Sequence, residues 1–243
     1  MHAWTFEHGV LTSPAAERWP RAHGPGVRML RTAIQLGMRA VLRNYNRVDV
    51  VGRGNLPIDK SFVMICNHSS HLDAVCLLST LPLGRIHHAF PVAAADYFFS
   101  TRLRSLLSII AINGVPLDRA NGGSGLDVCR QLLRGSKTVL IIFPEGTRSC
   151  SGALGRFRSG VARLVAGTDV PVVPCYLSGA FEAWPRHRRL PRPGALRLRI
   201  GRPQTFPDVS PLDREGVAAI SSRLRDEIIA LGREELPDSA HFC

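Results

Sequence analysis

The stretch SFVMICNHSSHLDAVCLLST, residues 61–80, decides the fold class of this chain. Residues 61–67 form a short run rich in apolar side chains, which predicts a buried strand. From about residue 70 to residue 81 the pattern is helical. A strand that leads through a polar turn into a helix is the repeating unit of an α/β sheet, so this stretch predicts one such unit.

The same alternation continues on both sides of this unit. Further strands are expected at residues 46–52, 87–93, 112–118, 138–143, 170–177 and 195–201, and further helices at 95–110, 123–135, 157–167 and 211–232. The sequence therefore predicts an α/β fold, a single domain with a mostly parallel sheet flanked by helices.

The 243 residues divide into four expected parts. A flexible arm covers residues 1–25, an amphipathic basic helix covers 26–44, the main domain covers 45–232 and a tail covers 233–243. In the helix, four arginines fall between apolar positions, which marks it as a surface element. Such a helix packs its apolar stripe on a core or lies in a lipid interface, and the pattern leaves both alternatives open.

The charge of the chain is strongly positive. The sequence has 31 Lys and Arg against 19 Asp and Glu, a net charge of +12, and only Lys60 and Lys137 are lysines. This balance favours phosphate-bearing partners, namely nucleic acid, an anionic membrane or a phosphorylated substrate. A coding bias toward arginine would also contribute, so charge alone selects no function. It does exclude an acidic, disordered, solvating chain.

The cysteines and the apolar segments indicate a cytoplasmic protein. The six cysteines form no C-x-x-C pair and most lie in apolar runs, so we expect reduced, buried thiols. The first residues lack the apolar run of a signal peptide. No run of about 18 uncharged apolar residues occurs, so membrane contact is expected to be interfacial.

The first candidate site is the turn NHSSHLDA, residues 67–74. Four residues separate His68 from Asp73, so the carboxylate can fold back onto the imidazole, fix its tautomer and leave the other nitrogen to take a proton. Two alternatives compete. Ser70 and Asp73 have the spacing of a helix capping box. His71 would join His68 and Asp73 in a metal site, although no further ligand cluster appears in the sequence.

The second candidate site is the turn IIFPEGTRS, residues 141–149. An apolar strand delivers Gly146, which allows close backbone approach, then the Thr147 hydroxyl and the Arg148 guanidinium, whose planar fork matches a phosphate. In open α/β sheets ligands gather at the carboxyl ends of strands, so both turns are expected at that edge.

Taken together, the two turns resemble the glycerolipid acyltransferase family. NHSSHLD at 67–73 is similar to its N-H-x-S-x-x-D block, and FPEGTRS at 143–149 matches its second diagnostic block letter for letter. Weaker likenesses occur at GVPLDR (114–119), FRSG (157–160) and VPVVPCYLSG (170–179).

This resemblance implies an O-acyltransferase. It would move a fatty acyl group from acyl-CoA or acyl-ACP to a free hydroxyl of a lysophospholipid, by default 1-acylglycerol-3-phosphate, giving phosphatidic acid. Glycerol 3-phosphate and other lyso-lipids are the alternative acceptors. His68 would be the general base and Asp73 would orient it, with no cofactor beyond the acyl thioester co-substrate and no metal.

The resemblance also implies which residues bind substrate. The acceptor phosphate would be held by Arg119, Arg148 and Arg158, and the acceptor pocket would include Glu145, Gly146 and Thr147. His71 and the turn Ala93, Ala94, Ala95 and Asp96 would line the same space. This chain departs from the family where Ala94 replaces a lysine and Asp96 a glutamate, which removes one cationic contact.

Two other classes compete with the acyltransferase, namely a metal-dependent hydrolase and a non-catalytic basic module that binds membrane or nucleic acid. The sequence has no helix-turn-helix, finger or aromatic RNA-binding signature, so nucleic acid is not an expected partner. The expected partners are the lyso-lipid acceptor, the thioester donor, an anionic membrane surface and acyl carrier protein. The expected location is cytoplasmic, peripheral on the inner face of the cell membrane.

Overall fold

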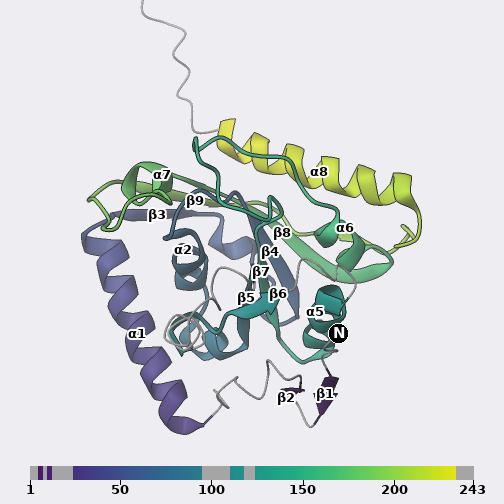
Figure 1. Cartoon of the computed structure of the whole chain (residues 1–243), viewed down its shortest axis with the longest axis horizontal. Helices are drawn as coiled ribbons and strands as arrows, with labels where there is room; N and C mark the ends of the chain where they lie inside the picture. The colour runs from purple at the N-terminus through teal and green to yellow at the C-terminus, as the bar shows by residue number, and fades with distance from the viewer. Residues whose placement is uncertain (1–4, 8–9, 13–23, 95–109, 118–123, 234–243) are drawn as a thin grey trace, which may run out of the picture.

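One eight-stranded sheet forms the centre of the protein, seen in a computed structural model that describes residues 5–7, 10–12, 24–94, 110–117 and 124–233 (Figure 1). Seven strands lie in the order β3-β9-β8-β4-β7-β5-β6, and β10 pairs with β8. Their bounds are β3 Val48–Val51, β4 Phe62–Cys66, β5 Ala89–Ala94, β6 Val115–Leu117, β7 Val139–Ile142, β8 Thr168–Ser178, β9 Leu196–Ile200 and β10 Gln204–Phe206.

The sheet is mostly parallel, which confirms the predicted fold class. Strands β8, β4, β7, β5 and β6 run in one direction. Strand β9 is antiparallel to β8 and parallel to β3, and β10 is antiparallel to β8. Strands β4 and β7 are direct neighbours in parallel register, with Ile65 opposite Ile142. The turns that follow these two strands therefore meet at one edge of the sheet.

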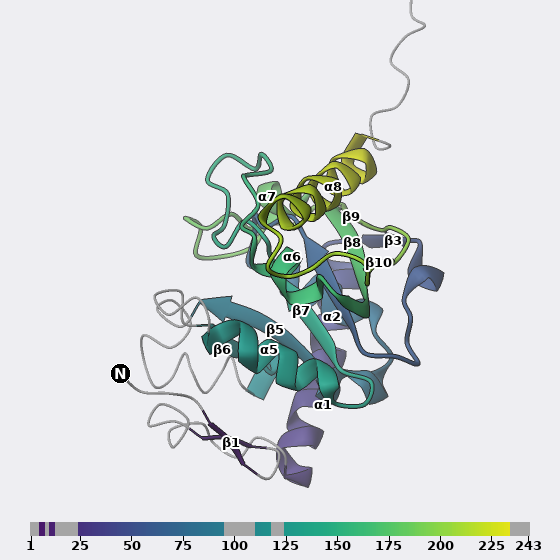
Figure 2. The same ribbon diagram turned by 90° about the vertical axis from the view of Figure 1, so that its right-hand side faces the viewer.

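Helices cover both faces of the sheet (Figures 1 and 2). Alternate residues of β4 point to opposite faces, so Phe62 and Met64 join the core under α1 and α2, whereas Val63 and Ile65 join the core under α5, α6 and α8. Each fully buried side chain of this kind contributes about 1.5–3 kcal/mol. The helix bounds are α1 Pro25–Asn44, α2 Asp73–Thr80, α5 Ser124–Arg134, α6 Gly160–Val165, α7 Ala180–Ala183 and α8 Arg214–Arg233.

Several predicted boundaries are wrong. The strand expected at 87–93 begins at Ala89, because His87 and His88 end a 3-10 helix, Leu83–His88. Residues 110–112 are helical where a strand was expected from 112. The sequence pattern also missed β10, α7 and a short 3-10 helix, Arg53–Asn55. Of the helix expected at 95–110, residues 95–109 lie outside the described residues.

The inner face of helix α1 carries polar side chains beside the expected apolar ones, such as Leu42, which is buried. Arg31 is only 1% exposed, and its Nε donates a hydrogen bond to the carbonyl of Ile110. Burial lowers the pKa of Arg31 to about 10. Gln35 is buried too and donates to the carbonyl of Ala111, and Arg39 donates to the carbonyls of Leu78 and Leu81. Of the four arginines, Arg31 and Arg39 thus turn inward, whereas Arg28 and Arg43 are exposed as expected.

The outer surface of α1 also exposes apolar side chains. Met29 is 73% exposed, and Leu30, Leu36 and Val41 are each about half exposed. Leu30 and Val41 belong to the stripe that the helical spacing would place against the core. None of the described helices is long and apolar enough to cross a membrane.

The remaining expectations concern the arm and the cysteines. Within residues 1–25, expected to be a flexible arm, β1 (Thr5–Glu7) pairs antiparallel with β2 (Val10–Thr12). Four of the free thiols are buried, as expected, and burial raises the pKa of the Cys129 thiol to about 12. Cys150 differs from the expected buried state, because it is exposed. Cys243 lies outside the described residues.

Candidate active site

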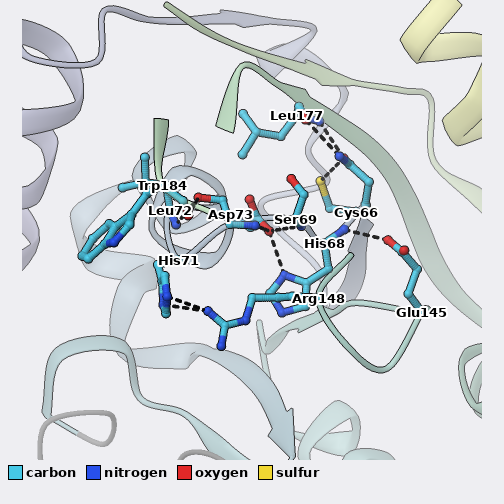
Figure 3. A network of polar contacts seen from close by, with 12 residues as sticks. Cys66, His68, Ser69, His71, Leu72, Asp73, Glu145, Arg148, Leu177 and Trp184 are labelled. Carbon is cyan, nitrogen blue, oxygen red and sulfur yellow. Dashed lines mark hydrogen bonds and ion pairs between the residues drawn. The ribbon is translucent and has the colours of Figure 1, made fainter. Parts of the chain in front are cut away.

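His68 and Asp73 form a close pair at the carboxyl edge of the sheet (Figure 3). His68 Nδ1 lies 2.7 Å from Asp73 Oδ2, and the Asp73 side chain is fully buried at the first residue of α2. The same oxygen accepts hydrogen bonds from the backbone N–H groups of Ser69 (2.8 Å) and Ser70 (2.9 Å). A carboxylate held in this way keeps a proton on Nδ1, so Nε2 is the atom that can accept a proton from a substrate.

Of the alternative capping box, only the bond from the Ser70 N–H to Asp73 Oδ2 forms. The residue that precedes α2 is Leu72, with no side-chain capping bond. The Ser70 hydroxyl donates instead to the carbonyl of Trp184 at 2.8 Å and accepts from the N–H of Leu72. Asp73 is therefore committed to the imidazole and to the turn that carries it.

Two further residues fix the position of His68. The Asn67 amide donates to the carbonyl of Leu177 (2.9 Å) and accepts from its N–H (2.8 Å), which ties the end of β4 to β8. The His68 ring stacks on Phe143, with 4.0 Å between ring centroids and 14° between ring planes. Neither Asn67 nor Phe143 was expected to have a role at the site, although both stand inside the quoted motifs.

Glu145 joins the two turns. One carboxylate oxygen accepts from the N–H of His68 at 2.7 Å and the other from the N–H of Gly155 at 2.8 Å. Burial raises the pKa of Glu145, while these two hydrogen bonds favour its charged form. Ser149 N–H donates to the carbonyl of His68 at 2.7 Å and closes the link. That Glu145 also lines an acceptor pocket stays a prediction, because both of its oxygens contact backbone.

The glycine turn lies directly under Arg158. Gly146 has φ of 72°, a conformation that favours glycine, and a Cβ built there would lie 2.7 Å from Arg158 Nε. The N–H of Arg158 donates to the carbonyl of Pro144. Thr147, next in the turn, is exposed. The structure thus brings Arg158 to the turn that also carries Arg148.

Arg148 reaches back to the first turn. Its Nη1 lies 2.8 Å from the ring nitrogens of His71, and the His71 ring is tilted against Trp184 at 5.0 Å between centroids (Figure 3). Burial, followed by the charge of Arg148, lowers the pKa of His71. A neutral imidazole therefore contacts the guanidinium, and the His71 ring turns toward Arg148 and Trp184 instead of joining His68 as a metal ligand would.

For the other predicted site residues, the structure describes the backbone of Ala93 and Ala94 only. Ala93 and Ala94 end β5, whose carboxyl end lies at the same sheet edge, and their backbones pair with Pro116 and Leu117 of β6. Ala95, Asp96 and Arg119 lie outside the described residues. Within the described ranges, no three His, Cys, Asp or Glu side chains gather as metal ligands would. In chemical terms the site offers an oriented base beside two arginines.

Comparison with known proteins finds several relatives named 1-acyl-sn-glycerol-3-phosphate acyltransferase. The 1-acyl-sn-glycerol-3-phosphate acyltransferase alpha of Ovis aries is 25% identical over 191 residues, covering 77% of this chain and 63% of that protein. The human protein of the same name is 26% identical, covering 77% of this chain and 64% of that protein. A chloroplastic 1-acyl-sn-glycerol-3-phosphate acyltransferase of Brassica napus is 34% identical over 145 residues, covering 58% of this chain and 40% of that protein. The chain thus spans less than two thirds of the length of these curated relatives.

A solved structure has the same fold. The 1-acyl-sn-glycerophosphate acyltransferase of Thermotoga maritima superposes with a TM-score of 0.66 at 23% identity, covering 93% of this chain and 87% of that chain. A family model described as Acyltransferase matches residues 47–178, a range that includes both turns of the site and the strands that carry them. More than half of the sequence lies in that match, and the chain therefore belongs to the acyltransferase family.

Proposed function

We propose that this protein is an O-acyltransferase that converts 1-acylglycerol-3-phosphate into phosphatidic acid, with acyl-CoA or acyl-ACP as the donor. The observation that carries the proposal is the His68 and Asp73 pair, 2.7 Å apart beside the turn of Arg148. The curated relatives carry the name of this activity, which supports the same acceptor.

The reaction follows from the oriented base. His68 Nε2 takes the proton from the acceptor hydroxyl as the hydroxyl oxygen attacks the thioester carbonyl carbon. The new ester C–O bond forms, the C–S bond breaks, and the leaving thiolate takes the proton back from the imidazolium. Asp73 holds the ring and stabilises the imidazolium. A positioned general base such as His68 contributes about 10² to 10⁴ in rate. The acyl group passes directly from donor to acceptor, with no resident cofactor.

The acceptor phosphate is assigned to arginines. Arg148 is held at the site by His71, and the Arg158 side chain covers Gly146 on the same turn. Charge-assisted, bidentate hydrogen bonds suit a guanidinium facing a phosphate. Arg119 is included in this proposal only because it ends the block GVPLDR, residues 114–119.

The outer face of α1 supports a peripheral membrane location. Met29, Leu30, Leu36 and Val41 expose their side chains, whereas Arg31 is buried on the inner face. A helix with apolar side chains on its outer face is suited to lie in the interface of a bilayer, where a lyso-lipid acceptor resides. We place the protein on the cytoplasmic, inner face of the cell membrane.

The activity is tested by a panel of lyso-acceptors and glycerol 3-phosphate with one long-chain acyl-CoA, the product being identified by mass. The wild type should acylate 1-acylglycerol-3-phosphate in preference to the others and release free CoA. Preference for another hydroxylated lipid would change the assigned substrate, and absence of product with every acceptor and with both donors would contradict the proposal.

A further inference from the structure

The segment WPRHRRLPR, residues 184–192, has the composition of a solvated connection but is tied down at several points. At its start, the carbonyl of Trp184 accepts hydrogen bonds from the Ser70 hydroxyl (2.8 Å) and from the N–H of His71 (3.3 Å). Its indole N–H donates to the carbonyl of Arg188 at 3.0 Å. We call this segment the 184–192 loop. One end of it therefore supports the turn of residues 67–73, which carries His68 and Asp73 and is called the catalytic turn below.

The other end of the loop is bound to the end of α1. The Tyr45 hydroxyl donates to the carbonyl of Pro191 and the Asn46 amide donates to the carbonyl of Arg192, both at 3.2 Å. The N–H of Arg192 donates to the carbonyl of Ala183 at 2.8 Å. The loop therefore bridges the membrane-suited helix and the catalytic turn, and its shape is set before any ligand binds.

The surface of the loop combines cations with one exposed leucine. Arg186, Arg189 and Arg192 are exposed, and Leu190 between them is 75% exposed. Residues 183–207 contain no Asp or Glu, and neither do residues 24–48, which include α1. The positive charge of both segments is therefore not offset within them. Through Tyr45, 41% exposed, the loop also adjoins the apolar outer face of α1.

We propose that the 184–192 loop is a second bilayer contact of this protein, selective for anionic lipids. Arg186, Arg189 and Arg192 contact lipid phosphates, and Leu190 enters the boundary of the acyl chains. The proposal rests on the proposed function, because the contact between the loop and the bilayer orients the lipid-handling site toward the membrane. Docking through the loop holds His71, and with it the catalytic turn, at the level of the headgroups.

An anionic bilayer fits these features better than an acidic carrier protein. Charge would suit both partners, but a leucine exposed to this extent beside a helix with an apolar outer face is suited to a lipid interface. A loop fixed by hydrogen bonds also loses little conformational entropy when it binds.

The test is vesicle binding by the triple variant Arg186→Gln, Arg189→Gln, Arg192→Gln, measured by co-sedimentation. With about fivefold in affinity per basic residue, the variant should bind phosphatidylglycerol-rich vesicles on the order of 100-fold more weakly than the wild type. Binding to pure phosphatidylcholine vesicles should stay within a few fold. Leu190→Ser should weaken binding to both kinds of vesicle. Wild-type affinity of the triple variant for anionic vesicles would overturn the proposal.

A matched control removes the same charge elsewhere. Arg202, Arg214 and Arg233 are exposed outside the loop and α1, and their replacement by Gln should change vesicle binding only a few fold. Equal loss in the control variant would show that net charge alone drives binding and would overturn the proposal.

Turnover on a short-chain, water-soluble acceptor separates this inference from the proposed function. The loop variant should keep wild-type turnover there, since no bilayer takes part. If the wild type itself gives no turnover, the proposed function fails while the vesicle result still decides the loop. If the variant binds vesicles normally but loses turnover only with acyl-ACP, the loop binds an acidic protein and the inference is wrong.

Discussion

Asp73→Asn tests how the catalytic base is oriented. In the wild type, Asp73 Oδ2 alone accepts three hydrogen bonds, from His68 Nδ1 and from two backbone N–H groups, within 2.7–2.9 Å. The amide oxygen of asparagine can take the same three bonds, so the turn should keep its shape. What the substitution removes is the negative charge that stabilises the imidazolium.

The magnitude follows from that charge. Two unit charges about 4 Å apart interact by about 4 kcal/mol at an effective dielectric constant near 20. The proton is only partly transferred in the transition state, so about 2–4 kcal/mol is lost, which lowers kcat between about 30-fold and 1,000-fold. Within the described residues, Asp73 Oδ1 is buried without a hydrogen-bond partner. The asparagine NH₂ placed there should cost about 1–3 kcal/mol of stability, a Tm decrease of about 2–4 °C per kcal/mol.

The assay is steady-state kcat of folded protein, with Tm measured beside it. Asp127→Asn is the matched control, because Asp127 is an exposed carboxylate paired with Arg130 on α5, and its kcat should be unchanged. If Asp73 acts through His68, the double variant His68→Ala, Asp73→Asn should match His68→Ala alone. More than half of wild-type kcat in Asp73→Asn, or a further large loss in the double variant, would refute the reasoning.

Three further predictions concern the turns and two partly buried histidines. Gly146→Ala should lower Tm, because the left-handed backbone conformation costs a non-glycine residue about 1–2 kcal/mol. It should also raise the KM for the acceptor, because the added methyl group displaces the Arg158 side chain. An unchanged KM would show that this turn is not part of the acceptor site. Glu145→Gln should lower both kcat and Tm, since a glutamine NH₂ would face a backbone N–H, a mismatch of about 1–3 kcal/mol; calorimetry and kinetics check both. Burial lowers the pKa of His71 and of His87, so the unfolded chain binds more protons and stability should fall as pH drops below about 6.5. Denaturant unfolding at neutral and at mildly acidic pH should show a smaller loss of stability in His87→Gln than in the wild type. An equal loss would show that His87 does not contribute to this pH dependence.

Most of the sheet could be predicted because its strands carry their own signal. Strands such as β4, Phe62–Cys66, and β7, Val139–Ile142, are apolar throughout, as is typical of strands covered on both faces. The elements that were predicted wrongly depend on hydrogen bonds to residues that are distant in the sequence. His87 ends a 3-10 helix, and its carbonyl accepts from the Asn113 amide. Arg31 is buried because its guanidinium donates a hydrogen bond to the carbonyl of Ile110, 79 positions away. The helical spacing of apolar residues gives no information on such a distant contact.

The candidate site divides in the same way. Spacing within one turn was enough to predict that Asp73 contacts His68, because the two are only five positions apart. Glu145 stands in a recognised motif, yet its link to the His68 backbone depends on β4 and β7 being parallel neighbours. The contact between Ser70 and Trp184 could not be predicted, since it is made to a backbone carbonyl 114 positions away.

The most direct test of the central claim is the turnover of purified, folded His68→Ala with long-chain acyl-CoA and 1-acylglycerol-3-phosphate, product being identified by mass. With His68 as the general base, the folded variant should form phosphatidic acid about 10² to 10⁴ times more slowly than the wild type. Near-normal turnover by the folded variant would contradict the account.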